Sequence, residues 1–280
     1  SMNAIEIKAR HKSVDDLFYF ARYVLGYDLL TERLHKPLCD FLMDQTSNRK
    51  LIEMPRGFFK TTVVSRAYPI WLSIRNPNIR ILLANMIADN AAKNVHAIRW
   101  HWEHNQRLRR LFPELVPDIR HTRWSDACAE IRRSAGYGEG TYESVGVGGS
   151  KIGAHYDVII EDDLVGARKD SLSGQEILPN QDDMDKAIGW HNLAINLLIS
   201  PTKGEIVNVG TRWGRYDLIA HIKKNRKYTR FIRSAIETTE HGKPILDENG
   251  QWIPTYPERF PLDVLREIEE QQGSYLFSMM

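Results

Sequence analysis

Short apolar runs alternate with longer amphipathic stretches along most of the chain, which is the pattern of a parallel sheet joined by crossover helices. We therefore expect an α/β fold with a mainly parallel central sheet flanked by helices. The apolar runs predict strands at 50–54, 79–84, 129–133, 156–161, 205–210 and 229–236. Helical spacing of apolar residues predicts helices within 14–46 and at 60–74, 87–110, 184–199, 214–225 and 261–272.

One stretch departs from this alternation, because residues 135–154 contain seven glycines in twenty residues. Such a composition predicts a mobile loop beside a site.

Composition narrows the class of protein. A chain of 280 residues, 42% of them apolar, can bury one large core or two modest ones. The net charge of +2 provides no global basic field, so any contact with DNA has to be local. The two cysteines, Cys39 and Cys128, lie far apart and without metal-ligand spacing, which predicts ordinary buried thiols in a reducing cytoplasm. No run of 18 apolar residues is present, so we expect no membrane span.

The stretch LIEMPRGFFKTTV at 51–63 contains the three parts of a phosphate cradle: a strand that ends abruptly, a loop, and the N-terminus of a helix. The familiar form G-x-x-x-x-G-K-[ST] has glycine where this chain has Met54 and Phe59. Lys60 would contact the β and γ phosphates, and Thr61 would contact Mg²⁺. A loop without glycine at 59 can present its amides if its backbone stays at negative φ. The alternative is an ordinary strand-to-helix turn.

A second strand, within DVIIEDD at 157–163, ends in three consecutive carboxylates: Glu161, Asp162 and Asp163. Their repulsion is costly unless a cation or a proton compensates. In a nucleoside triphosphatase, one carboxylate holds Mg²⁺ through water and the next polarises the attacking water. A solvated acidic loop is the alternative. Both elements together favour a P-loop ATPase.

The run PRGFFKTT at 55–62, with an arginine early in the loop, resembles the phosphate loop of large terminase subunits, the DNA-packaging motors of tailed bacteriophages. The resemblance implies the ATPase half of such a subunit: a P-loop NTPase fold of the ASCE type with an N-terminal helical subdomain. It makes Arg56 the loop arginine, Lys60 the phosphate lysine and Thr61 a metal ligand. The nucleotide-binding residues of the loop would be Pro55, Arg56, Gly57, Phe58, Phe59, Lys60, Thr61 and Thr62.

The run IIEDDLVG at 159–166 is similar to the acidic strand end of the same family. This resemblance implies that Asp162 is the magnesium-side acid and Asp163 the catalytic acid. A shift by one residue, which would give these roles to Glu161 and Asp162, stays open, so Glu161 is also a catalytic candidate.

Three further stretches carry the resemblance. LHKPLCDFL at 34–42 implies that His35 lies near the adenine, and a histidine on a helix surface is the alternative. VNVGTRWGRYDL at 207–218 resembles the coupling motif, in which Thr211 and Arg212 would sense the γ phosphate; a structural ion pair is the alternative for Arg212. Residues 256–280 resemble the segment that leads to an RNase H-like nuclease, which we expect to be absent from this chain.

The resemblance implies three parts: an N-terminal helical segment at 1–48, an ATPase core at 49–260 and the start of a linker at 261–280. It also implies hydrolysis of ATP with Mg²⁺ that drives double-stranded DNA into procapsids in the host-cell cytoplasm. The expected partners are DNA, the portal protein, the small terminase subunit and further copies in a ring, with no membrane.

The sequence offers three candidate DNA contacts, at 100–110, 223–230 and 135–154, and does not choose among them. For each basic cluster a solvated helix face is the alternative. The alternative functions are a helicase-like P-loop motor and a nucleotide-binding scaffold without turnover.

Overall fold

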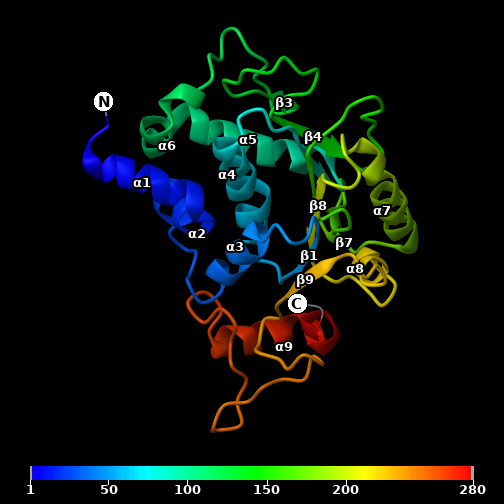
Figure 1. Ribbon diagram of the computed structural model, residues 1–280. Coiled ribbons are helices and arrows are strands. Elements are labelled where there is room, and N and C mark those ends of the chain that lie inside the picture. Colours follow the sequence, from blue (N-terminus) through cyan, green and yellow to red (C-terminus); the bar gives the residue numbers. More distant parts are fainter. Residues whose placement is uncertain (1, 279–280) are drawn as a thin grey trace.

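The computed structural model describes residues 2–278, and residues 1, 279 and 280 of the expected terminal segments lie outside the described residues. Its strands are β1 (Arg49–Glu53), β2 (Ile81–Asn85), β3 (Cys128–Ala129), β4 (Tyr142–Gly146), β5 (Val158–Asp162), β6 (Arg168–Lys169), β7 (Glu176–Ile177), β8 (Glu205–Gly210) and β9 (Thr229–Ile232). Seven of the described strands form one sheet in the order β3-β4-β2-β5-β8-β1-β9, and only β3 in that sheet runs antiparallel to its neighbour (Figure 1). β6 and β7 form a separate hairpin.

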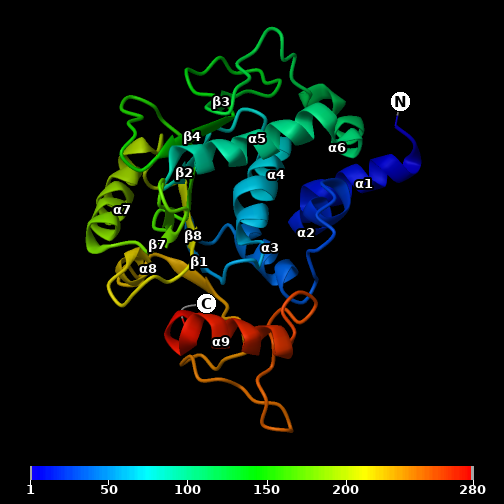
Figure 2. The same cartoon turned by 180° about the vertical axis from the view of Figure 1, so that it is seen from behind.

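The helices lie on both faces of this sheet. They are α1 (Ala4–Asp15), α2 (Leu17–Tyr19), η1 (Phe20–Val24), α3 (His35–Met43), η2 (Thr62–Ala67), α4 (Tyr68–Arg75), α5 (Ala88–His104), α6 (Gln106–Leu111), η3 (Pro113–Leu115), α7 (Gln181–Ala194), η4 (Ile195–Leu197), α8 (Leu218–Ile222) and α9 (Leu262–Ser278). Figures 1 and 2 show α4 and α5 against one face, with α1 and α2 outside them and α3 below α4, and α7 and α8 on the opposite face. The expected α/β fold, with a mostly parallel sheet and N-terminal helices, is confirmed.

The central strands β2, β5 and β8 are buried on both faces, as parallel strands covered by helices must be. Along β8, Val207 and Val209 belong to the core under α4 and α5, whereas Ile206 belongs to the core under α7 and α8. The same alternation along β5 places Ile160 in the first core and Ile159 in the second. Side chains two residues apart on one strand therefore share a face, and this decides which carboxylates can meet the phosphate loop.

Two predictions of secondary structure were wrong in the region between β2 and β5. The strand predicted at 129–133 is only the two-residue β3. The glycine-rich stretch at 135–154, predicted to be a mobile loop, contains β4, which pairs with β2 along its whole length and buries Tyr142 completely. Glu143 and Ser144 interrupt the apolar pattern of this strand, and Glu143 is held by Lys151 and Tyr156.

At the N-terminus, helix begins ten residues earlier than predicted, at Ala4 instead of residue 14. Asn3 and Glu6 form a reciprocal capping box at the start of α1. This helix has a weak apolar face, so periodicity did not reveal it, but the capping pattern was readable in the sequence.

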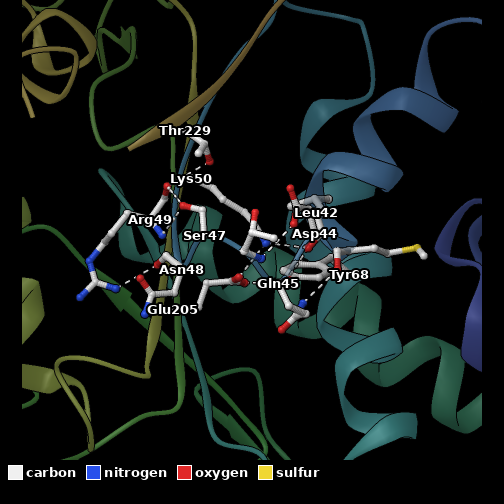
Figure 3. Close-up of polar contacts among 12 residues, drawn as sticks. Leu42, Asp44, Gln45, Ser47, Asn48, Arg49, Lys50, Tyr68, Glu205 and Thr229 are labelled. Carbon is white, nitrogen blue, oxygen red and sulfur yellow. Dashed lines mark hydrogen bonds and ion pairs between the residues drawn. The ribbon is translucent and has the colours of Figure 1, made fainter. Parts of the chain in front are cut away.

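A buried polar network fixes the amino ends of β1 and β8 (Figure 3). The Lys50 ammonium donates to the Leu42 carbonyl at 2.7 Å and pairs with Glu205 at 2.8 Å. The Tyr68 hydroxyl donates to the other oxygen of Glu205. The network ties α3, β1, β8 and α4 together, and its charges are compensated within it.

Candidate nucleotide-binding site

The residues predicted to bind phosphate form a closed loop between β1 and the helix that follows. At its start, the Met54 amide donates to the Gly210 carbonyl at 3.2 Å, and the Thr211 hydroxyl donates to the Met54 carbonyl at 3.2 Å. Lys60 is 5% exposed, and its ammonium lies 3.5 Å from the Pro55 carbonyl. The loop therefore wraps around the lysine, which is the arrangement expected of a phosphate cradle.

The loop backbone takes the left-handed conformation twice, at Gly57 with φ +78° and at Phe59 with φ +60°. Negative φ at position 59 was the condition under which a loop without glycine there presents its amides, and the structure does not meet that condition. The glycine of the familiar pattern adopts positive φ without cost, whereas a bulky side chain there is an outlier. Phe59 thus takes the backbone conformation of the missing glycine.

His35 supports the loop from the core side. It is fully buried, so the alternative of a histidine on a helix surface was wrong. Its Nδ1 accepts the Thr31 backbone N–H at 2.8 Å, which leaves Nε2 to carry the proton and donate to the Phe58 carbonyl at 2.9 Å. Burial lowers the pKa of His35, so the ring is neutral near pH 7.

Asp162, at the end of β5, meets the first turns of the helix after the loop. Its Oδ1 accepts the Thr61 hydroxyl at 3.2 Å, and its Oδ2 accepts the Ser65 hydroxyl at 2.8 Å and the Asn94 amide at 3.4 Å. Burial, and next the charge of Asp163, raises the pKa of Asp162 to about 7, against the opposing effects of Ser65, Lys60 and Thr61. A buried carboxylate with a raised pKa favours a compensating cation.

Ser65 and Asn94 were not predicted. Ser65 lies four residues after Thr61 on a helix, so the two hydroxyls share one face, and this spacing was a signal in the sequence. Asn94 comes from α5, and nothing in the sequence placed it beside the loop.

Asp163 is the first residue after β5, and its backbone is held on both sides. Its amide donates to the Val209 carbonyl at 3.0 Å, and its carbonyl accepts the Met86 amide at 3.1 Å. Its φ is +46°, a second left-handed position without glycine, which aspartate tolerates better than a bulky side chain does. Its carboxylate lies against Gly210, where an added Cβ would be 3.7 Å from Oδ1. Asp163 therefore sits at the ends of β5 and β8, beside the loop.

Glu161 lies on the other face of the sheet. It is fully buried, and its carboxylate is 2.7 Å from His191 Nδ1 on α7. Burial of His191 opposes its charged form, but the Glu161 carboxylate outweighs burial and raises the pKa of His191. The structure does not bring Glu161 to the cluster formed by the loop, Asp162 and Asp163.

Arg56 and Arg212 are engaged away from Lys60. Arg56 pairs with Glu176 of β7 at 2.7 Å, and its guanidinium lies 4.6 Å from the centre of the Trp213 ring. Arg212 pairs at 2.9 Å with Asp217, the N-cap residue of α8, and also donates to the Gly214 carbonyl. Arg212 therefore takes part in a structural ion pair, which was the alternative to its sensing the γ phosphate. Thr62, the remaining predicted loop residue, is the half-buried first residue of η2.

The oxygen atoms gathered here suit a hard cation. Within residues 2–278, no group of three or more His, Cys, Asp or Glu side chains could hold a metal ion by itself. Mg²⁺ keeps several waters and needs few protein ligands when phosphate oxygens complete its shell. The Asp162 carboxylate beside the Thr61 hydroxyl fits that chemistry.

None of the helices in the described part of the chain is long and apolar enough to cross a membrane.

Solved structures share this fold, and two of them are large terminases of bacteriophages. A mutant of the ATPase domain of the Thermus phage P74-26 large terminase matches with a TM-score of 0.55 and 14% identity, over 94% of this chain and 95% of that chain. The large terminase of bacteriophage HK97 matches with a TM-score of 0.56 and 13% identity, over 94% of this chain and 52% of that chain. No family model and no curated protein matches the sequence. The chain therefore has the fold of large terminase ATPase domains and spans about half of the HK97 protein.

Proposed function

We propose that this chain is the ATPase domain of a viral DNA-packaging motor, which hydrolyses ATP with Mg²⁺ and moves double-stranded DNA into a procapsid. The observation that carries the proposal is the hydrogen bond from Thr61 to Asp162, since it joins the phosphate loop to the acidic end of β5. These are the two groups that a Mg²⁺–nucleotide complex requires side by side. The fold shared with terminase ATPase domains supports the same assignment.

Each residue of the cluster has a role in this proposal. The backbone N–H groups of 56–62 and the Lys60 ammonium bind the β and γ phosphates. Thr61 and Asp162 hold Mg²⁺, which when bound neutralises phosphate charge. Asp163 orients the attacking water and accepts its proton. Placing Glu161 and Asp162 in these roles is disfavoured, because Glu161 faces α7 and not the loop.

Three residues around the loop have supporting roles. His35 would position the loop beside the adenine through the Phe58 carbonyl. Thr211 touches the start of the loop at Met54, so loss of the γ phosphate there would be passed to α8 through the turn at 211–217. Arg212 would join this movement only by leaving Asp217, and Arg56 would reach phosphate only by leaving Glu176. The division into segments 1–48, 49–260 and 261–280 is part of the same proposal.

For DNA, we favour the basic cluster at 223–230. Lys224, Arg226 and Lys227 are exposed in the turn between α8 and β9. In the stretch 100–110, by contrast, Trp102 is fully buried, and its arginines bond to their own chain: Arg107 to the Tyr23 carbonyl, Arg109 to the Trp102 carbonyl and Arg110 to Glu6. Exposed cations can bind the phosphate backbone without first losing an internal partner.

A salt titration tests this assignment. Replacing Lys224, Arg226 and Lys227 by alanine should weaken binding to duplex DNA and reduce the slope of log affinity against log salt by about 2 to 3. An Arg107→Ala, Arg110→Ala double variant is the comparison and should leave that slope unchanged. The reverse outcome would move the DNA contact to 100–110.

In the complete motor, a ring of copies would act with the portal protein and the small terminase subunit in the host-cell cytoplasm.

The central experiment measures ATP binding and turnover in Lys60→Ala. We expect turnover to be abolished, whereas Lys93→Ala, which removes an exposed lysine of α5, should match the wild type. Asp162→Asn should weaken Mg²⁺-dependent nucleotide binding, and Asp163→Asn should retain binding but lose turnover. Near wild-type turnover in Lys60→Ala would end the phosphate-loop assignment.

Two other functions make different predictions. A helicase-like motor would separate DNA strands with ATP, whereas the proposed motor translocates on an intact duplex. A nucleotide-binding scaffold would bind ATP with no turnover in the wild type.

A further inference from the structure

Residues 256–260, here called the closing segment, pack directly on the phosphate loop although about 200 residues separate the two in sequence. The Phe58 ring is stacked on the Phe260 ring, with centroids 5.0 Å apart and planes at 7°. The Tyr256 ring meets Phe58 edge-on at 5.6 Å. Phe58 is fully buried by these contacts, so the closing segment forms one wall of the loop.

The same segment contacts the residues on either side of Phe58. The Arg259 guanidinium lies 4.9 Å from the centre of the Phe59 ring. At Gly57, with φ +78°, an added Cβ would lie 2.8 Å from Phe260 Cζ, so the segment leaves room there for glycine only. Three consecutive loop residues are therefore shaped against the closing segment.

This packing explains how Phe59 keeps a φ of +60° without being glycine. A bulky residue in the left-handed region persists only when its surroundings impose that conformation. Here Phe58 is held by its ring through Phe260 and by its carbonyl through His35, so the next residue has little freedom. In the familiar pattern, glycine adopts this conformation by itself.

We propose that Tyr256, Arg259 and Phe260 are positioning residues of the nucleotide site, which impose on Phe59 the backbone conformation that a glycine would adopt unaided. This inference rests on the proposed nucleotide binding. It follows that nucleotide affinity depends on the docking of the closing segment, and that the dependence disappears when position 59 is glycine.

A double-mutant cycle tests the dependence. The dissociation constant for a non-hydrolysable ATP analogue with Mg²⁺ is measured by calorimetry in the wild type, Phe260→Ala, Phe59→Gly and the double variant. We expect Phe260→Ala to weaken binding about tenfold with Phe59 present and less than about threefold with glycine at 59, because glycine reaches the left-handed region freely.

Two comparisons separate backbone conformation from lost packing. Phe59→Ala removes the ring but keeps a side chain at positive φ, so Phe260→Ala should still weaken binding about tenfold in that background. Phe41, like Phe260, is a half-buried residue whose ring meets another phenyl ring, that of Phe231 at 5.7 Å. Phe41→Ala should lower the melting temperature as Phe260→Ala does but leave the dissociation constant within about twofold.

Two conservative variants complete the test. Phe260→Tyr keeps the stacked ring and should bind the analogue like the wild type. Arg259 is exposed, so Arg259→Met removes the guanidinium above Phe59 without opening the core, and it should weaken binding by about threefold. This variant keeps the proposal testable if Phe260→Ala does not fold.

Equal weakening by Phe260→Ala in the wild-type and Phe59→Gly backgrounds would overturn the inference and leave the proposed function intact. In that case the wild type would still bind the analogue, and Lys60→Ala would still lose it. A wild-type protein that binds no ATP analogue would overturn the proposed function and this inference with it.

Discussion

The Asp162→Asn substitution should stabilise the nucleotide-free protein at pH 8 while removing its function. Asp162 is buried, and its carboxylate accepts hydrogen bonds from Thr61, Ser65 and Asn94. An asparagine can keep these contacts: its oxygen faces Ser65 and Asn94, and its amide donates to the Thr61 hydroxyl, which can also accept. The substitution therefore removes a buried charge with little change in shape.

The size of the effect follows from the pKa of Asp162, which burial raises from 3.8 to about 7. A raised pKa means that the folded state favours the protonated carboxyl. This contribution to stability is complete below about pH 4 and is lost as the pH rises through about 7. At 1.36 kcal/mol per pKa unit, the loss is about 4 kcal/mol by pH 8, of which about 2.5 kcal/mol falls between pH 5 and pH 8. Asparagine does not titrate, so the variant escapes this loss.

Urea unfolding at pH 5 and pH 8, without nucleotide or Mg²⁺, measures the effect. The free energy of unfolding of Asp162→Asn relative to the wild type should rise by about 1 to 2.5 kcal/mol between the two pH values. Glu248→Gln, at an exposed carboxylate, is the control and should stay within about 0.5 kcal/mol at both. A difference that does not change with pH would refute the argument from buried charge. Mg²⁺ with an ATP analogue should stabilise the wild type more than the variant.

Three further substitutions give distinct results. Thr211→Val should keep ATP affinity within about tenfold, because Thr211 contacts the loop backbone and not Lys60, while DNA packaging by the complete motor is lost; affinity and packaging measured together test this. His191→Gln should lower the free energy of unfolding by about 3 kcal/mol at pH 6 and by less at pH 9. The raised pKa of His191 stabilises the fold at pH values below the pKa of the unfolded state, and this stabilisation is lost as the pH rises through the pKa of the folded state. Equal losses at the two pH values in an unfolding experiment would contradict this. Lys50→Met should lower the free energy of unfolding by about 3 to 5 kcal/mol, because it leaves the Glu205 carboxylate buried without its cation. Adding Glu205→Gln should recover most of this loss in a melting experiment. Additive losses in the double variant would argue against a coupled pair.

Much of the fold was predictable because parallel strands have continuous apolar sequences. The strand predicted at 205–210 coincides with β8, which is buried at every residue. The strand β4 escaped prediction because Glu143 and Ser144 break its apolar run and glycines surround it. Its polar side chains find partners from other segments, and a reading of single stretches cannot foresee such pairing.

For the candidate site, the sequence located the elements but not every contact. Lys60 and Thr61 come after β1, and Asp162 and Asp163 come at the end of β5. Because parallel strands have their carboxyl ends on the same side of a sheet, it was predictable that these residues lie on one side. The order β5-β8-β1, which brings them close together, was not. Nor was the positive φ of Phe59, since the cause lies in packing from the closing segment. Alternation along any strand turns Glu161 away from Asp162, but only the three-dimensional fold shows that Asp162 is the one that faces the phosphate loop.

The position of β8 between β1 and β5 has a consequence for how the chain folds during synthesis. β1 and β5 leave the ribosome before β8. They do not pair with each other, because β8 lies between them in the sheet and follows β5 by about 40 residues in the sequence. The phosphate loop and the acidic strand end therefore come together only after residue 210 has emerged, through contacts of long sequence separation that form slowly. Nascent chains arrested before and after this point should differ sharply in protease resistance, and ATP should protect only the longer ones.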